Sequence, residues 1–447
     1  MRAPPSFFQA YRTKAKSRGF LGMNSTALVW FRNDLRLHDH QALSEAIQHH
    51  SHCLAIYSDK PKTLKHTGLS SPGAFRKQFI NEALIDLSQS LAALNIPLLV
   101  LDEPATEAIP KLIHEHKVDV VYAHREHAFE EKNDEQSLRN ALNIPLKLYE
   151  GGFLVMPDDL PFADDKIPDI FTQFRKKVEA LSTFRAPLPA PTKVMQPLEL
   201  QASTLNPGSN TVDARTAFPF RGGEKAALQH LKTYIWENQY ISTYKETRNG
   251  LLGSAYSSKM SPWLACGSLS PRKIYQEVKR FEQEVIANDS TYWLIFELLW
   301  RDYFRHVYRK FGARFFHRNG LALRPSPKKM RKNTDIFRRW TEGQTAEPFV
   351  DANMRELKLT GFMSNRGRQN VASFLVNDLG IDWRWGAEYF QHQLIDYDVY
   401  SNWGNWAYVS GVGNDPREDR YFNVRKQAQM YDPDGLFVKT WIGSLES

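Results

Sequence analysis

Five short apolar runs in the first third of the chain constrain its fold more than any other feature. They cover residues 27–31, 52–57, 96–102, 118–124 and 144–150, and longer segments with helical patterning separate them. Each run is continuously apolar rather than alternating, which indicates strands buried on both faces of a parallel sheet covered by helices. Residues 24–150 are therefore predicted to form a doubly wound α/β domain. No G-x-G-x-x-G turn occurs there, so an ordinary dinucleotide site is not expected in it.

The rest of the chain follows a different pattern. Between residues 151 and 216, prolines interrupt any long element and predict an interdomain linker. From residue 217 to 447, apolar residues recur at helical spacing, which predicts an all-helical domain. All tryptophans except Trp30 lie beyond residue 235. This asymmetry indicates that indole rings serve a group held in the C-terminal half, although a large helical core would also use them.

Residues 1–23 are left out of the predicted fold. They are basic and free of acids, which is typical of a transit peptide but equally of an upstream start or a disordered extension. No apolar run has the length of a membrane span, and the only two cysteines, Cys53 and Cys266, indicate a reducing compartment. We expect a cytoplasmic monomer without membrane contact, with organellar targeting by residues 1–22 left open.

Basic residues gather in one part of the helical half. Thirteen Lys/Arg and two acids lie between Arg301 and Trp340, interleaved with aromatic rings. Such a stretch suits a polyanion with stackable bases, and a solvated helix face is the alternative.

An acid interrupts an aromatic stripe in residues 290–311. At helical spacing, Trp293, Glu297, Trp300 and Phe304 share one face, and Ser290 is the predicted N-cap. The Glu297 carboxylate must find a donor there. It either meets an arginine or backbone N–H groups, or it accepts hydrogen bonds from a heterocycle stacked on Trp300.

Two further segments carry polar groups suited to a ligand. In residues 254–271, small hydroxyls and Lys259 precede a helix predicted to start with Ser261 as N-cap and Pro262, which forms either an anion site or only a cap. In residues 360–375, a helix starting near Asn365 directs Arg368 toward Asp396 and Asp398. That contact is either part of a site or a structural ion pair.

These segments in this order resemble the cryptochrome/photolyase family over nearly the whole chain, from residue 26 to residue 442. The motifs are LVWFRNDLRLHDHQAL (28–43), WLIFELLWRDYFRH (293–306), TGFMSNRGRQNVASFL (360–375) and DYDVYSNWGNWAY (396–408). GVGNDPREDRYFNVRKQAQMYDPDG (411–435) resembles the DASH-type cryptochromes in particular.

The resemblance implies an N-terminal antenna domain and a C-terminal domain that holds FAD. By motif position the flavin contacts would be Tyr244, Ser257, Ser258, Lys259, Met260, Ser261, Trp293, Arg301, Arg368, Asp396, Asp398 and Asn402. Trp406 and Trp383 would supply electrons for photoreduction. In the family, a third, outer tryptophan completes this series of electron donors, and its position here aligns with Met330. Either another ring such as Trp340 or Tyr303 substitutes, or photoreduction is impaired.

The implied activity is blue-light repair of cyclobutane pyrimidine dimers by electron transfer from reduced FAD. Lesion and DNA contacts would be Arg248, Glu297, Trp300, Asn365, Arg366, Gln369 and Tyr408. Gln369 and Tyr408 replace the methionine and tryptophan usual in photolyases that act on duplexes, which predicts single-stranded DNA as the main substrate and leaves RNA as a further candidate. The histidine pair of (6-4) photolyases would fall on Asn365 and Gln369, so that chemistry is not expected.

Two expectations complete the resemblance. YAHREH (122–127) looks like the segment whose glutamate, here Glu126, meets a methenyltetrahydrofolate antenna, with a deazaflavin or no antenna as alternatives. The competing function is a blue-light photoreceptor that binds nucleic acid without repair. Signalling cryptochromes commonly carry long C-terminal tails, and this sequence stops a few residues after Trp441, which favours repair.

Overall fold

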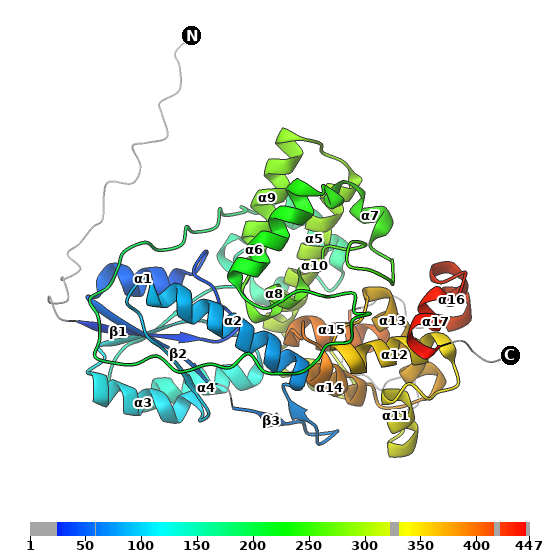
Figure 1. The fold of residues 1–447 in the computed structure, drawn as a ribbon, viewed down its shortest axis with the longest axis horizontal. Helices are drawn as coiled ribbons and strands as arrows, with labels where there is room; N and C mark the ends of the chain where they lie inside the picture. Colours follow the sequence, from blue (N-terminus) through cyan, green and yellow to red (C-terminus); the bar gives the residue numbers. More distant parts are fainter. Residues whose placement is uncertain (1–24, 59, 322–329, 415–420, 444–447) are drawn as a thin grey trace, which may run out of the picture.

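The computed structural model describes residues 25–58, 60–321, 330–414 and 421–443, and the predicted leader lies outside them. Its blue α/β part and its green-to-red helical part lie beside each other in Figure 1. No helix within the described ranges is both long enough and apolar enough to cross a lipid bilayer.

All five predicted strands are present and form one parallel sheet. They are β1 (Thr26–Phe31), β2 (His52–Ser58), β5 (Leu98–Leu101), β6 (Val120–His124) and β7 (Leu146–Tyr149), in the order β5-β2-β1-β6-β7. Helices α1 (Gln41–His49) and α2 (Ala74–Ala92) cover one face, and α3 (Ala105–His116) and α4 (Phe129–Ala141) cover the other (Figure 1). Because successive side chains of a strand point to opposite faces, β1 contributes to both cores. The doubly wound prediction is confirmed.

A short hairpin ties the α/β domain to the helical domain. It is formed by β3 (Lys62–Thr63) and β4 (Ser70–Ser71). Its turn donates the backbone N–H groups of His66 and Thr67 to the buried Glu388 carboxylate at 2.8 Å each, and the N–H of Gly73 bonds the His392 carbonyl at 2.9 Å. Both acceptors lie on α14 (Trp383–Gln393), one of the helices that support the site.

The linker contains a helix that its prolines did not predict. After two short 3-10 turns, η1 (Pro157–Asp159) and η2 (Asp164–Lys166), α5 spans Phe171–Leu181. The rest of the linker is extended and runs back along the α/β domain (Figure 1), where Met195 and Ser203 bond backbone carbonyls of Leu94 and Leu98. α5 forms because no proline occurs between residues 169 and 186 and because its apolar side packs on the helical domain. The limits of the predicted domains remain predictions.

The C-terminal half is helical over its described residues, as expected. Its α-helices are α6 (Glu224–Lys232), α7 (Tyr244–Thr247), α8 (Ser261–Cys266), α9 (Pro271–Glu284), α10 (Asp289–Phe311), α11 (Thr334–Thr341), α12 (Pro348–Thr360), α13 (Asn365–Ser373), α14, α15 (Val399–Val409), α16 (Val424–Tyr431) and α17 (Leu436–Ile442). Shorter turns are η3 (Thr233–Glu237), η4 (Tyr240–Thr243), η5 (Gly312–Phe316) and η6 (Phe374–Asp378).

The predicted N-cap of α10 is wrong by two residues. Asn288 caps this helix, and its side-chain oxygen accepts the backbone N–H groups of Ser290 and Thr291. The Thr291 hydroxyl oxygen in turn accepts the Asn288 backbone N–H at 3.1 Å, which completes a capping box. The Ser290 hydroxyl instead donates to Glu246 at 2.7 Å. An asparagine and a serine are equally good caps by type, so the reciprocal contact with Thr291 decides between them.

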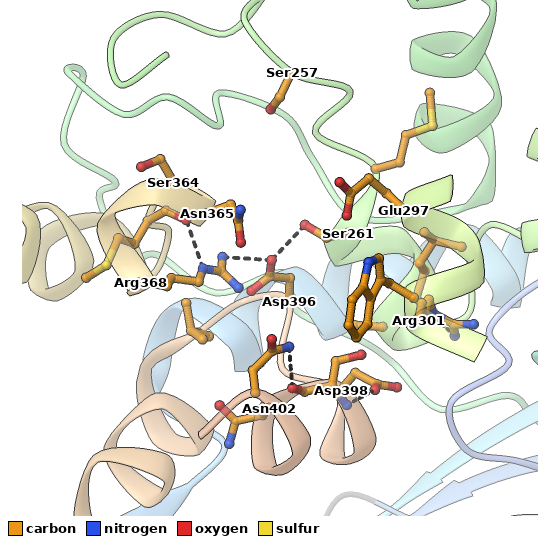
Figure 2. Close-up of a pocket in the computed structure, with 18 of the residues that line it drawn as sticks. Ser257, Ser261, Glu297, Arg301, Ser364, Asn365, Arg368, Asp396, Asp398 and Asn402 are labelled. Atoms are coloured by element: carbon orange, nitrogen blue, oxygen red, sulfur yellow. Dashed lines mark hydrogen bonds and ion pairs between the residues drawn. The ribbon is translucent and has the colours of Figure 1, made fainter. Parts of the chain in front are cut away.

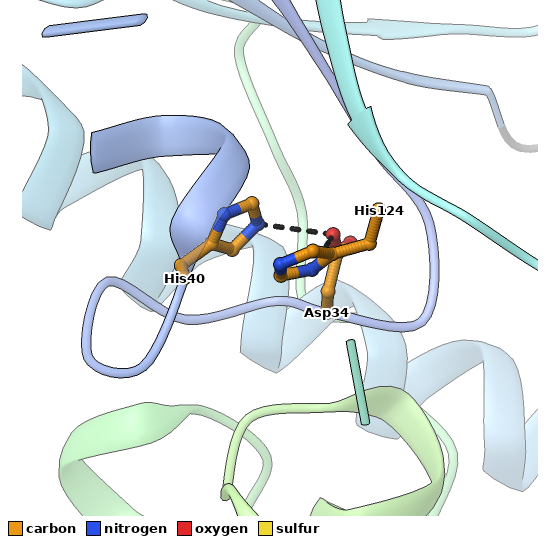
Figure 3. A group of neighbouring side chains, drawn as sticks. All are labelled: Asp34, His40 and His124. Atoms are coloured by element: carbon orange, nitrogen blue, oxygen red, sulfur yellow. Dashed lines mark hydrogen bonds and ion pairs between the residues drawn. The ribbon is translucent and has the colours of Figure 1, made fainter. Parts of the chain in front are cut away.

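Two buried histidines and an aspartate meet at the carboxyl ends of β1 and β6, where the strand order reverses (Figure 3). The Asp34 carboxylate lies 2.9 Å from His124 Nδ1 and 3.0 Å from His40 Nε2. His40 Nδ1 accepts the N–H of Leu43 at 3.1 Å. Burial lowers the pKa of His124 to about 4, so this ring is neutral. The Asp34–His124 hydrogen bond and the close approach of His40 thus join the loop after β1 to the end of β6.

Candidate cofactor and nucleic-acid site

A cavity of about 520 Å³ lies in the helical domain, between α8, α10, α13 and α15 (Figure 2). Its size falls in the range of small-molecule and cofactor sites. Of the predicted flavin contacts, those lining it are Tyr244, Ser257, Ser258, Lys259, Met260, Ser261, Arg301, Arg368, Asp396, Asp398 and Asn402. All the predicted nucleic-acid contacts also line it, namely Arg248, Glu297, Trp300, Asn365, Arg366, Gln369 and Tyr408. Trp406 is on the wall, whereas Trp293, Trp383 and Glu126 are not.

An arginine and an aspartate form an ion pair in the cavity wall, as the spacing predicted. Arg368 donates to the Asp396 carboxylate at 2.8 Å, and the Ser261 hydroxyl donates to the same oxygen at 2.6 Å (Figure 2). Ser364 caps α13 by accepting the N–H of Gly367. A Cβ on Gly367 would lie 2.0 Å from the Asn353 side chain, so only glycine lets α13 approach α12 this closely. This packing places Arg368 over the cavity.

Asp398 does not join the Arg368 pair. It caps α15 by accepting the N–H of Ser401 at 2.8 Å, and Arg305 binds its other oxygen at 3.1 Å. Burial alone would raise the pKa of Asp398, but the guanidinium groups of Arg305 and Arg301 hold it below its ordinary value. Asp398 is therefore an anion in the wall of the cavity and fixes the start of the helix that carries Asn402.

The hydroxyl-rich loop before α8 contributes a buried cationic side chain. α8 begins at Ser261, so Met260 is its N-cap residue and the predicted Ser261 cap is wrong by one position. The Ser261 hydroxyl is used by Asp396 instead of by the helix backbone. Lys259 has a left-handed backbone with φ 54°, and its side chain is buried.

Several buried polar atoms of residues that line the cavity lack a hydrogen-bond partner within the described ranges. They are Lys259 Nζ, Tyr256 Oη, Asp396 Oδ1, Arg301 Nε and Arg366 Nε. A buried polar group without a partner costs about 1–3 kcal/mol, so such a group in a native site points to a ligand that satisfies it. Cations, hydroxyls and a carboxylate facing one cavity fit a dinucleotide with phosphates, sugars and a polar ring, and the residues present therefore fit FAD.

Glu297 lies at the wall in a charge-assisted pair. Arg248 donates to its carboxylate at 2.6 Å, and the indole N–H of Trp293 donates to the same oxygen at 3.2 Å. Burial raises the pKa of Glu297, and Arg248 opposes that shift. Trp293 thus holds the Glu297 carboxylate through its indole N–H and does not itself line the cavity. The arginine contact considered from sequence is present, and the carboxylate still faces the cavity.

One face of Trp300 is covered by the linker helix. Phe171 of α5 stacks on it with ring centroids 3.8 Å apart and planes inclined by 16°. Tyr408 meets the indole edge-on at 6.1 Å. A Cβ on Gly404 would come within 2.3 Å of the Phe304 ring, so this glycine lets α15 pack on α10. No feature of the sequence identified Phe171 as part of the site.

Arg366 uses most of its donors within the protein. It bonds the side-chain oxygens of Gln369 and Asn249 at 2.9 Å each, and its guanidinium lies 4.3 Å from the Tyr431 ring centroid. It therefore joins α13 to α16 and to the loop after α7, and it is less available to a phosphate than its motif position suggested.

The two predicted electron donors lie on neighbouring helices, Trp383 on α14 and Trp406 on α15. Trp406 contacts Phe390 at 5.1 Å and Trp340 at 6.3 Å, whereas Trp383 contacts Trp403 at 5.7 Å. Arg318 connects Met330 to Trp383. Its Nε donates to the Met330 sulfur at 3.3 Å, and its backbone carbonyl accepts the Trp383 indole N–H at 3.1 Å. The buried Trp340 is thus a ring in direct contact with Trp406.

Glu126 lies between the two domains and both its carboxylate oxygens are occupied. Asn33 donates to one and the Tyr400 hydroxyl donates to the other, each at 3.1 Å. Tyr400 also lies under Arg305, the partner of Asp398. Neither Tyr400 nor Arg305 was predicted as a site residue, although Arg305 follows Arg301 at i+4 on the same helix face.

Comparison with known proteins identifies the family. The model for the DNA photolyase domain matches residues 27–192, and that for the FAD-binding domain of DNA photolyase matches residues 293–447. A protein of Synechocystis sp. named cryptochrome DASH is 47% identical over 433 residues, which cover 94% of this chain and 88% of that protein. The chain belongs to the cryptochrome and DNA photolyase family. The FAD-binding match agrees with the polar groups that line the cavity.

Solved structures of the family agree in fold. The crystal structure of the Synechocystis sp. PCC6803 cryptochrome superposes with a TM-score of 0.89 at 46% identity and covers 95% of this chain and 90% of that one. An archaeal photolyase of Sulfolobus tokodaii gives a TM-score of 0.75 at 26% identity, covering 94% and 91%. That photolyase contains two FAD molecules, which implies a novel light-harvesting cofactor for it. The antenna therefore differs within this family.

Proposed function

We propose that the chain is a light-driven repair enzyme for cyclobutane pyrimidine dimers, mainly in single-stranded DNA. One observation carries the proposal: Glu297, Trp300, Asn365, Gln369 and Tyr408 line the same cavity as the Arg368–Asp396 pair. Cofactor and lesion would then meet in one enclosed space. Reduced FAD, when bound, supplies the light-driven electron that opens the cyclobutane ring and receives it back.

The cofactor would be held by groups at opposite ends of the cavity. Arg368 and Asn402 offer hydrogen-bond donors to a polar ring, and Asp396 keeps Arg368 in place through a charge-assisted bond. Ser257, Ser258 and Lys259 offer hydroxyl and ammonium donors to phosphate oxygens. These roles follow from the chemistry of side chains that share the cavity.

The lesion would be bound by stacking and by two polar side chains. Phe171 covers one face of Trp300, which leaves the other face for a base. Glu297 accepts, and Asn365 both donates and accepts, hydrogen bonds at the polar edge of a pyrimidine. A dimer must leave its base stack to reach this space, and that costs about a few kcal/mol, least for a single strand.

Repair in light and in darkness tests the proposed function. We expect the full-length, FAD-loaded protein to restore a dimer in a single-stranded oligonucleotide only under blue light, and on the order of tenfold faster than in the matching duplex. The readout is the loss of the dimer, measured by chromatography. An RNA strand with the same lesion is tested as a third substrate. Equal rates on single strand and duplex would contradict the assigned preference.

The second candidate function is a blue-light photoreceptor without repair activity. The name cryptochrome carried by the relative from Synechocystis favours it. The same experiment separates the two functions, since a photoreceptor leaves the dimer intact in light while its flavin still changes absorbance.

Trp406 is the proposed inner donor for photoreduction. We expect Trp406→Phe to abolish blue-light bleaching of oxidised flavin, because phenylalanine is much harder to oxidise than indole. Trp236→Phe, a partly buried tryptophan on η3 outside the cavity, is the matched control and should bleach normally. Unchanged bleaching of Trp406→Phe would exclude this donor.

The next donor is tested with two more variants. Trp383 is the proposed one, so Trp383→Phe should slow bleaching. If only Trp340→Phe slows bleaching, Trp340 is the next electron donor instead, since its ring centroid lies 6.3 Å from that of Trp406.

Three further expectations stay predictions. A folate at Glu126 would bind a carboxylate that already accepts hydrogen bonds from Asn33 and Tyr400. Cytoplasmic location and the monomeric state also remain untested.

A further inference from the structure

The side-chain amide of Gln369 is held by an arginine on the same helix. Arg366 and Gln369 lie three positions apart on α13, so their side chains are neighbours on one face of it. The Arg366 Nη1 atom lies 2.9 Å from the side-chain oxygen of Gln369. Because a guanidinium carries donors and no acceptor, the amide atom that it meets must be the oxygen and not the nitrogen. The contact therefore decides which end of the amide faces Arg366.

Arg366 is itself fixed by residues from other parts of the chain. Its Nη2 donates to the Asn249 side chain at 2.9 Å, and its Nη1 lies 3.4 Å from the Gln427 side-chain oxygen. The ring of Tyr431 lies against the guanidinium, 4.3 Å from centroid to carbon. Contacts from the loop after α7 and from α16 thus hold Arg366 in place, and it holds the Gln369 oxygen.

The amide nitrogen of Gln369 is the polar atom left for a ligand. Gln369 lines the cavity, and no residue of the described ranges accepts a hydrogen bond from this nitrogen. An amide nitrogen carries two N–H donors and is not an acceptor. Gln369 therefore offers donors, and no acceptor, to a molecule in the cavity.

Glu297 offers the opposite function in the same cavity. Arg248 and Trp293 both donate to its Oε1 atom, which leaves Oε2 without a partner among the described residues. The edge of a thymine carries an N–H group flanked by carbonyl oxygens. An acceptor on α10 and a donor on α13 are complementary to these two kinds of group.

We propose that Arg366 fixes the Gln369 amide so that its N–H donors face the cavity and bind a carbonyl oxygen of the dimerised pyrimidines. The inference rests on the proposed repair function and adds a lesion contact to those of Glu297 and Asn365. Arg366 is in this case a positioning residue, because it acts on the lesion through Gln369. Methionine, which lacks any N–H group, could not make this contact.

Replacing the donor by an acceptor tests the orientation of the amide. Gln369→Glu keeps the side-chain shape and an oxygen for Arg366, but its other oxygen turns an acceptor toward the cavity. Gln369→Met removes both groups. The readout is the preference for a dimer-bearing single strand over the undamaged strand, as the ratio of their Kd values. Fluorescence anisotropy of the FAD-loaded, full-length protein in darkness gives both values.

The two variants should lose this preference to different extents. We expect a fall of about threefold to tenfold in Gln369→Met, because one hydrogen bond between neutral groups is lost. Gln369→Glu should lose more, about tenfold or beyond, because its carboxylate meets the carbonyl oxygen without a shared proton. Repulsion between the new charge and the phosphates affects both strands and cancels in the ratio.

Gln276→Glu is the matched control for the added charge. Gln276 is an exposed residue of α9, outside the cavity, and Lys273 donates to its side-chain oxygen at 3.1 Å. This variant has the same change of side chain beside a cation, so it should keep the wild-type preference.

The role of Arg366 is tested in two backgrounds. Arg366→Met should lower the preference in the wild-type protein, because the Gln369 amide is then free to rotate. The same change in the Gln369→Met protein should have no further effect on the ratio, since the amide is already gone. A phosphate contact made by Arg366 itself would weaken binding of both strands and leave the ratio unchanged.

Two results would overturn the inference. One is a Gln369→Glu protein that keeps the wild-type preference, because an acceptor would then serve as well as a donor. The other is an Arg366→Met change that leaves the ratio unchanged in the wild-type background or lowers it equally in both. A wild-type protein that neither prefers the damaged strand nor repairs it in light would instead refute the proposed function.

Discussion

Glu297→Ala is expected to reduce light-dependent repair of a dimer-bearing single strand by about tenfold to a hundredfold while FAD stays bound. The carboxylate faces the cavity from α10 and accepts from Arg248 and Trp293 on its other side. Loss of one hydrogen bond to a charged group is worth about 1.5–3 kcal/mol, which corresponds to that range. Because the Arg368–Asp396 pair is untouched, the proposed flavin contacts should be preserved.

Two controls separate a lesion contact from a structural role. Glu297→Gln keeps an oxygen for the Trp293 indole and an amide edge for a pyrimidine, so it should lose less activity than Glu297→Ala. Glu246→Ala, on α7 outside the cavity, should repair at the normal rate. Release of flavin from Glu297→Ala, seen as loss of the 450 nm region of its absorbance, would show that the ion pair with Arg248 holds the fold of the cavity instead.

Asp396→Asn is expected to weaken FAD binding by about a hundredfold or more. Its side chain is only 2% exposed and accepts from both Arg368 and Ser261. Removing one partner of a buried ion pair costs about 3–5 kcal/mol, because the remaining charge is left uncompensated. Arg368 would then lose its fixed position over the cavity. The measurement is Kd from flavin fluorescence at a constant pH of 7.

Asp382→Asn is the matched control for this change. Asp382 is also a buried aspartate, pairing with Arg384 at 2.7 Å, but it caps α14 outside the cavity. This variant should lose thermal stability without a comparable loss of FAD affinity. Equal loss of affinity in both variants would mean that cofactor release follows from general destabilisation and not from the Arg368 contact.

The elements of the fold could be predicted because their signals are local. Five continuously apolar runs identified the strands, since burial on both faces of a parallel sheet removes alternation. Helical spacing predicted that Arg368 points toward Asp396 and Asp398, and the family resemblance implied the pair with Asp396. Local signals failed where two residues were equally suitable. Asn288 and Ser290 are both good caps. The prolines did not predict α5, because the 18 residues from 169 to 186 contain none and the helix occupies 11 of them.

Side-chain partners were not predictable, because they come from distant parts of the chain. Asp398 pairs with Arg305 and not with Arg368, and Phe171 covers Trp300 from across the linker. Arg366 is occupied by Asn249, which lies 117 residues away. A residue type shows that a charge or ring needs a partner, but not which of several partners lies within reach.

From the amino-acid sequence alone follow the α/β and helical halves, the family, and most of the residues that surround the cavity. The tertiary structure alone decided which of them face the cavity, which support a neighbour and which remain unsatisfied. Asp398 shows the reason. Periodicity reports how much of a side chain is buried, whereas the partner of a buried carboxylate depends on the groups that packing brings around it, 93 positions along the chain in the case of Arg305.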